Sequence, residues 1–204
     1  MKTITRNTEG TLRELGSKFL GFLFCCENEA ELREQLDQIK KEYPDASHHC
    51  YGYRVDPNML IEFSSDDGEP SGTAGLPILN QLKSAELINT GAVVVRYFGG
   101  TKLGKAGLIQ AYGGTAELCI SEASFKQIIQ VQLMEIKYPY SQENLIQKLE
   151  LTFDLTVQHS EYLEEITKVY ACPIDKSQKC AIELASFEHL SIQSKMLHKS
   201  YISV

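Results

Sequence analysis

The sequence predicts an α+β protein of two domains. Its 204 residues are 43% hydrophobic, which is enough to bury a core and fits one large or two small domains. In the first part of the chain, short apolar runs typical of buried strands alternate with amphipathic helical patterns. From Val131 onward the pattern changes to strand, helix, strand, strand, helix, strand. We therefore expect a first domain at 1–128 and a second at 129–204.

The elements of the first domain follow from local patterns. The run KFLGFLFCC at 18–26 is short, aromatic and apolar, as in a buried strand. Asn28 and Glu31 have the spacing of a capping box, and Pro44 ends the helical pattern that follows them. The remaining elements that we expect are strands at 47–55, 59–63 and 92–98 and helices at 73–87 and 107–123.

The second domain has a simpler pattern. Its elements in order are VQLMEIKYPY (strand), SQENLIQKLEL (helix), LTVQHSEYL (strand), EITKVYACPI (strand), DKSQKCAIELASF (helix) and HLSIQSKML (strand). This βαββαβ order is the split-βαβ, ferredoxin-like arrangement.

Composition limits the classes of function. The net charge of −7 is spread along the chain, which disfavours a globally basic nucleic-acid binder but leaves room for one basic patch. The first residues lack the apolar stretch of a secretory signal, and no run approaches the roughly eighteen apolar residues of a membrane span. The six cysteines form no C-x-x-C pair and lie in apolar runs, as buried reduced thiols do. We expect a cytoplasmic protein without a membrane partner.

The segment GGTKLGKA at 99–106 resembles a phosphate-binding P-loop, because it fits G-x-x-x-x-G-K between a buried strand and a helix. Ala106 stands where a P-loop has the Ser or Thr that ligates Mg²⁺, which argues against nucleotide hydrolysis. Arg96, Lys102 and Lys105 form the sustained positive stretch of this acidic chain. Together with backbone N–H groups at a helix start they could bind an anion, and the alternative is an ordinary solvated turn.

A second segment, SSDDGEPSGTAGLPIL at 64–79, concentrates acids and glycines. Asp66, Asp67 and Glu69 could act in acid–base catalysis or hold a metal. They do not follow the spacing of a calcium loop, and such residues beside Gly and Pro more often form a turn. Ser71 is not in the G-x-S-x-G pattern of an activated serine.

The run His48–Cys50 suggests a metal site at first sight. Side chains alternate on a strand, so His48 and Cys50 share a face and His49 points away, whereas zinc takes roughly three or four ligands. We therefore expect no metal and no cofactor, and a structural hydrogen bond from His48 to the acidic segment. Tyr51 and Phe98 are among the aromatic residues that could stack on bases, but strand aromatics are usually core.

Four strings in this order resemble the YigZ/IMPACT family: ASHHCYGYR (46–54), FSSDDGEPSGTAGLPIL (63–79), VVVRYFGG (93–100) and KLGKAGLIQAYGG (102–114). The resemblance covers most of 18–123. It implies a first domain like domain two of a small-subunit ribosomal protein, and a second domain similar to the last domain of elongation factor G.

The resemblance also implies a connection to translation. Eukaryotic relatives regulate the stress kinase that senses uncharged tRNA, and they do so by competing with the kinase for its activator protein. Bacterial members look like nucleic-acid-binding or ribosome-associated proteins. Lys105 and Ala106 depart from the family's L-G-x-G-G-L loop, and Leu76 stands where a basic residue often follows T-A-G.

We predict that the two glycine-rich segments meet in one polar groove, because both lead into helices and glycine permits close approach by a partner. The groove would bind RNA, the ribosome or a translation factor, without DNA specificity and without catalysis. The alternatives are a regulator that contacts only protein and a small-molecule hydrolase or transferase using His48 with Asp66, Asp67 or Glu69. The ligand and the oligomeric state stay open. The expected groove residues are His48, Arg54, Asp66, Asp67, Glu69, Ser71, Arg96, Lys102 and Lys105.

Overall fold

The computed structural model describes all residues, Met1–Val204, and divides them into two compact units, Met1–Gln127 and Ile128–Val204. The boundary between the units lies at 127/128, one residue before the boundary of 128/129 that the sequence predicts. Strand β7 (Phe125–Tyr138) begins in the first unit and continues through the second. None of the helices is both long and apolar enough to cross a membrane.

The first unit is built on a five-stranded sheet with the order β2-β3-β6-β4-β5, in which every neighbouring pair is antiparallel. The short strand β1 (Lys2–Ile4) pairs with β7 instead. The strands of this sheet are β2 (Thr8–Glu14), β3 (Ser17–Cys25), β4 (His48–Val55), β5 (Ile61–Ser65) and β6 (Thr90–Tyr97).

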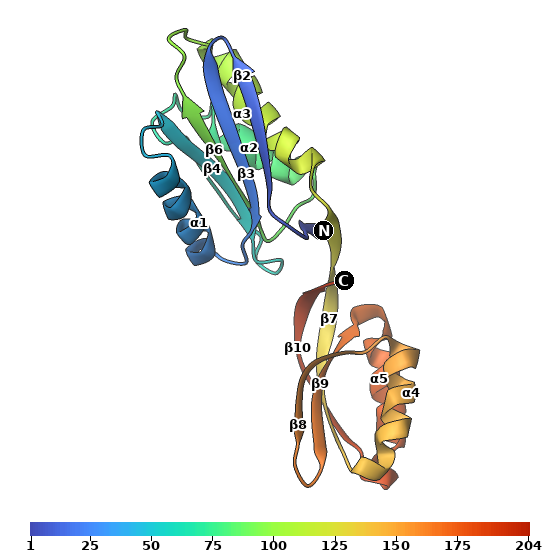
Figure 1. Cartoon of the computed structure of the whole chain (residues 1–204). Helices are drawn as coiled ribbons and strands as arrows, with labels where there is room; N and C mark the ends of the chain where they lie inside the picture. The colour runs from blue at the N-terminus through green and yellow to red at the C-terminus, as the bar shows by residue number, and fades with distance from the viewer. The chain divides into compact units, whose positions relative to one another are not determined.

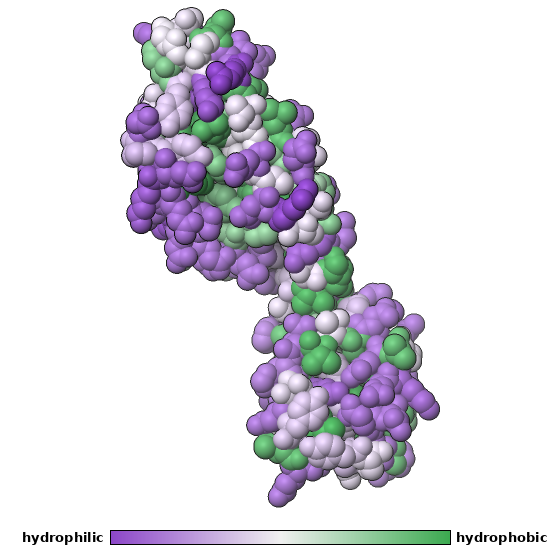
Figure 2. Space-filling model, in the orientation of Figure 1, coloured by the Kyte–Doolittle hydropathy of each residue, from purple (hydrophilic) through white to green (hydrophobic).

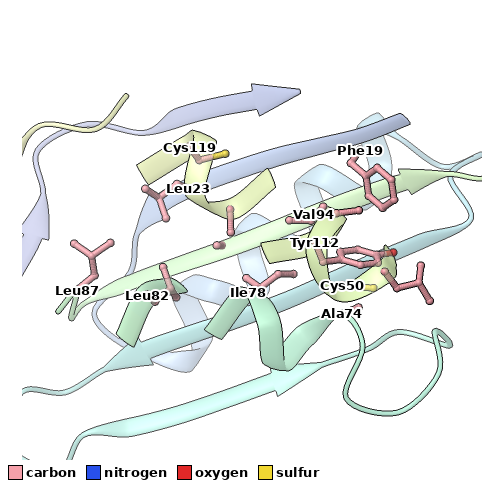
Figure 3. Packing of buried hydrophobic residues seen from close by; sticks show 14 of the residues in the cluster. Phe19, Leu23, Cys50, Ala74, Ile78, Leu82, Leu87, Val94, Tyr112 and Cys119 are labelled. Carbon is pink, nitrogen blue, oxygen red and sulfur yellow. The ribbon is translucent and has the colours of Figure 1, made fainter. Parts of the chain in front are cut away.

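Helices cover both faces of this sheet, with α1 (Glu29–Glu42) on one and α2 (Gly75–Ser84) and α3 (Gly104–Ser121) on the other (Figure 1). The central strand β6 shows the two faces directly. Val93 and Val95 pack in the cluster with α1, whereas Ala92 and Val94 pack with α2 and α3. Figure 3 shows the second of these cores, where Tyr112 of α3 lies beside Phe19 and Cys50 of the sheet. Because β6 is buried on both faces, its sequence is an uninterrupted apolar run.

The structure corrects the sequence analysis at the start of the chain, where no strand was expected. Strand β2 lies at the edge of the sheet and is largely solvent-exposed, so its polar sequence carries little apolar signal. Leu15 and Gly16, which connect it to β3, both have positive φ (44° and 81°), as the tight turn of a hairpin requires. Helix α3 also begins three residues earlier than expected, at Gly104, so part of the P-loop-like segment is helix.

The second unit has the predicted β-α-β-β-α-β order, and its sheet has the strand order β10-β7-β9-β8. Both helices lie on the same face of the sheet (Figure 1). The last strand begins later than expected, at Gln193, because a 3₁₀ turn at Glu188–Leu190 precedes it. Its other elements are a 3₁₀ turn at Tyr140–Gln142, α4 (Glu143–Phe153), β8 (Thr156–Tyr162), β9 (Ile166–Pro173), α5 (Ile174–Ser186) and β10 (Gln193–Ser203).

A buried lysine joins α4 to the sheet of the second unit. The Lys168 ammonium lies 3.0 Å from Glu143 and 3.5 Å from Glu150, and the hydroxyls of Tyr138 and Tyr170 donate to the same two carboxylates. The side chain of Lys168 is only 7% exposed, so its charge is compensated within the protein.

Asn28 caps α1 as its spacing from Glu31 predicts, although the Glu31 carboxylate returns to the N–H of Glu27, one residue before the cap. Asn28 Oδ1 accepts from the Glu31 N–H at 3.0 Å, and the Glu31 carboxylate accepts from the Glu27 N–H at 2.8 Å and from Asn28 Nδ2. These bonds satisfy donors that have no partner inside the helix.

The variant Asn28→Ala is expected to lower the free energy of unfolding by about 1 kcal/mol, because it removes this acceptor. Urea-induced unfolding measures the effect. Asn58→Ala is the matched control, since Asn58 takes part in its turn through its backbone N–H. An equal loss in both variants would contradict the assignment of the cap.

Candidate functional site

The two glycine-rich segments of the first unit meet at one edge of its sheet. Strands β5 and β6 are both antiparallel to β4, so they run in the same direction and their carboxyl ends lie at the same edge. The acidic segment follows β5, and the lysine-containing segment follows β6. Together they form a pocket of about 340 Å³, lined by Glu69, Pro70, Arg96, Phe98, Lys102–Lys105 and Leu108.

Arg96 is a buried, paired residue of the site and is not a free cation. Its Nη1 donates to Glu69 and its Nη2 to Ser17 Oγ at 3.3 Å, while the Tyr112 hydroxyl donates to the same Glu69 oxygen at 2.8 Å. The Arg96 and Glu69 side chains are 6% and 5% exposed. Burial, reinforced by Cys50 and Glu69 nearby, raises the pKa of Tyr112, so its hydroxyl stays protonated and donates. The Arg96 charge is thus neutralised inside the protein.

The positive charge of the pocket comes from Lys102 and Lys105, which are exposed and form no ion pair. Helix α3 starts between them at Gly104, with no side-chain cap and no acidic residue in its first turn. Its first N–H groups have no intrahelical partners, and the helix dipole adds partial positive charge. This part of the pocket is suited to an anion.

The acids of the other segment mainly hold the loop together. One oxygen of the Asp66 carboxylate accepts from Ala74 and Gly75 at 3.0 and 2.9 Å, and the other accepts from Gly72 at 2.8 Å. Desolvation alone would raise the pKa of Asp66, but these three backbone bonds outweigh it and the pKa is lowered. Asp67 accepts from the His49 N–H at 2.6 Å. Asp66 therefore caps α2, which has no cap of its own.

The histidines behave as the alternation of a strand predicts. His48 Nδ1 lies 2.8 Å from the Asp67 carbonyl oxygen, and His49 Nε2 reaches the Tyr43 carbonyl oxygen at 3.0 Å. Cys50 donates to the Asp66 carbonyl oxygen, and burial raises the pKa of its thiol to about 12. No group of three or more His, Cys, Asp or Glu residues in the structure could hold a metal ion.

Five residues expected in the groove are not among those that line the pocket. His48, Asp66 and Asp67 hold the acidic loop beside it, and Arg54 and Ser71 lie elsewhere. Arg54 is at the far end of β4, roughly 20 Å along the strand from His48, where it binds Glu62 at 2.9 Å and the Leu87 carbonyl oxygen at 2.7 Å. Ser71 is exposed and is not among the lining residues. His48 and Arg54 belong to the same short string of sequence, but each residue of a strand adds about 3.3 Å, so Arg54 lies far from the edge that carries the site.

Sequence reasoning also missed a residue of the pocket. The sequence favours Phe98 as a core residue of the strand, with base stacking as the alternative, but it lies one residue beyond β6 and is 50% exposed. The guanidinium carbon of Arg96 lies over the rings of Phe98 and Phe19, 5.4 Å from each ring centroid. The signal in the sequence was the position of Phe98 directly before Gly99-Gly100, where the strand has to end.

We expect Glu69→Ala to lower the free energy of unfolding by about 3 kcal/mol or more, because it leaves the Arg96 charge buried without a partner. Glu29→Ala removes the exposed ion pair with Arg33 on α1 and should change stability little. Chemical denaturation compares the two variants. Equal effects would show that the buried pair is not a structural constraint.

Asp66→Asn is expected to lower stability at pH 7 by about 2 kcal/mol, because bonds from N–H groups to a charged acceptor are stronger than those to an amide. The folded pKa of Asp66 is lowered, so its contribution is present above the unfolded value near 4 and is lost as pH falls through the folded value. The difference between the two proteins should therefore shrink below about pH 4. Unfolding curves from neutral to acid pH measure it, with the exposed Asp37→Asn as the charge control; a difference independent of pH would contradict it.

Comparisons with known proteins agree with this architecture. The Impact N-terminal domain model matches residues 15–120, which include the whole pocket. A crystal structure described as that of a hypothetical protein superposes with a TM-score of 0.70 and 28% identity, covering 97% of both chains. The same two-unit architecture therefore exists in a solved structure.

Two bacterial relatives are similar in sequence. YvyE of Bacillus subtilis is 40% identical over 134 residues, which cover 66% of this chain and 60% of that protein. YigZ of Escherichia coli is 32% identical over 180 residues, covering 87% of this chain and 88% of that protein. Since the domain model covers more than half of the chain and the second relative almost all of it, the chain belongs to the IMPACT family.

Proposed function

We propose that this protein is a non-enzymatic regulator linked to translation that binds RNA at the pocket between the two glycine-rich segments. The observation that carries the proposal is the uncapped start of α3, flanked by Lys102 and Lys105 and open to the pocket. Backbone N–H groups, a helix dipole and two lysines together favour a phosphate group. The link to translation rests on the family resemblance of the sequence.

The charge distribution supports a small contact with RNA rather than a broad one. The chain carries a net charge of −7, and the surface in Figure 2 is largely hydrophilic, with hydrophobic residues in small areas between. An extended duplex would bring many phosphates against acidic surface, which costs free energy. A contact limited to a few nucleotides avoids this cost.

The enzymatic alternative has less support, because each of its proposed groups already has a structural partner. Asp66 accepts three backbone N–H groups, and Glu69 neutralises Arg96. His48 is bonded to the Asp67 carbonyl oxygen. Catalysis by Asp66 or Glu69 would require breaking bonds that hold the loop in place.

The double variant Lys102→Gln/Lys105→Gln is expected to weaken RNA binding. It should also reduce the slope of log affinity against log salt by about 0.7, the contribution of the one single-strand phosphate held between the two lysines. Fluorescence anisotropy with a labelled oligonucleotide at several salt concentrations measures both quantities. Lys40→Gln/Lys41→Gln removes the same charge from an exposed part of α1 and is the matched control.

Affinity and salt slope that stay the same in the pocket variant, or fall equally in both variants, would refute the proposed site. Pull-down from lysate with and without nuclease tests the protein-only alternative. A partner that is retained after nuclease treatment, with no RNA recovered before it, would favour that alternative.

A further inference from the structure

A second, smaller pocket of about 180 Å³ adjoins the first at the start of α3. Leu103, the residue directly before the helix, lines both pockets and so separates them. Leu103 lies against Gly107, where an added Cβ would come within 2.9 Å of the Leu103 Cβ. The lining of the second pocket includes Leu12, Glu14, Leu15, Leu103, Gly107 and Gln110.

The two pockets differ in chemistry. The first offers the half-exposed ring of Phe98. The backbone at this residue is held by the Phe98 N–H bond to Ser47 Oγ and the Gly99 N–H bond to Ser17 Oγ, both 3.2 Å. Arg96 stacks near this ring. The second offers leucine side chains with one carboxylate and one amide at its rim. An exposed aromatic ring over a guanidinium is a stacking platform for a flat, electron-rich ligand.

Arg96 lines the first pocket without offering it a free donor. Its side chain is 6% exposed, its Nη1 and Nη2 donate to Glu69 and Ser17, and its unpaired Nε–H is buried. Arg96 therefore contributes to the site through its position next to the Phe98 ring.

We propose, on the basis of the function proposed above, that this site takes single-stranded RNA. One base stacks on Phe98, and its phosphate lies at the first turn of α3 between Lys102 and Lys105. The next ribose lies against Leu103 in the second pocket, where Glu14 or Gln110 accepts a hydrogen bond from its 2′-hydroxyl.

The ring of Phe98 and the carboxylate of Glu14 both favour single-stranded RNA over a duplex. The face of a base is free to stack on a side chain only when the base is unpaired and splayed out, whereas an A-form duplex keeps it inside the helix. Glu14 in the second pocket repels a phosphate. The RNA strand therefore has one phosphate site, in the first pocket, and an apolar contact in the second.

The test separates stacking from charge by changing the protein and the ligand together. The probes are an oligouridylate of about ten nucleotides and an abasic strand of the same length and charge. The starting protein should bind the oligouridylate roughly tenfold more tightly than the abasic strand, since stacking of one base supplies that factor. Phe98→Ala should bind both strands equally, at the affinity of the abasic strand. Anisotropy measures the affinities, and thermal unfolding verifies that the variant is folded.

Phe63→Ala is the control, because Phe63 on β5 is 49% exposed and lies outside both pockets. It should keep the tenfold preference. A preference that persists in Phe98→Ala, equal binding of the two strands by the starting protein, or tighter binding of an RNA duplex would overturn the single-strand assignment while leaving phosphate binding intact. Binding of none of these strands would overturn the proposed function as well.

Discussion

The buried ion pair between Arg96 and Glu69 is the constraint on which the site depends. It joins the end of β6 to the acidic segment, and through the bonds of Ser17 and Tyr112 it also reaches the start of β3 and the helix α3. Four parts of the chain that are distant in sequence are thereby held at one edge of the sheet. Because an unpaired charge in this place would be strongly unfavourable, the pair tolerates few alternative arrangements of the loops.

The same ion pair helps to determine that the charge at the pocket is positive. Arg96 and Glu69 cancel one another, Asp66 is occupied by the backbone of its own loop, and the Asp67 carboxylate bonds the His49 N–H. The charges that remain free at the rim are those of Lys102 and Lys105 beside the start of α3. A protein of net charge −7 can thus present a local anion site, because its acids in this region are used for structure.

The second unit uses a comparable device at a different place. Lys168, buried in the sheet, is held by two carboxylates of α4 and fixes that helix over the strands. Since α4 and α5 both cover one face of the sheet, the other face is not covered by a helix of this unit. The outer strand β10 carries Lys195 and Lys199 and no acidic residue, whereas its neighbour β7 carries Glu135 as well as Lys126 and Lys137.

The sequence alone determined the elements that depend on local pattern. The apolar run of β6, the Asn28 cap of α1 and the βαββαβ order of the second unit could all be predicted, because periodicity and capping act over a few residues. Strand β2 could not, since an exposed edge strand has little apolar signal. Only the tertiary structure decided that Arg96 is buried, that Phe98 is exposed and that Arg54 lies far from the site. These outcomes depend on strand order and register, which bring together residues that no short stretch of sequence contains.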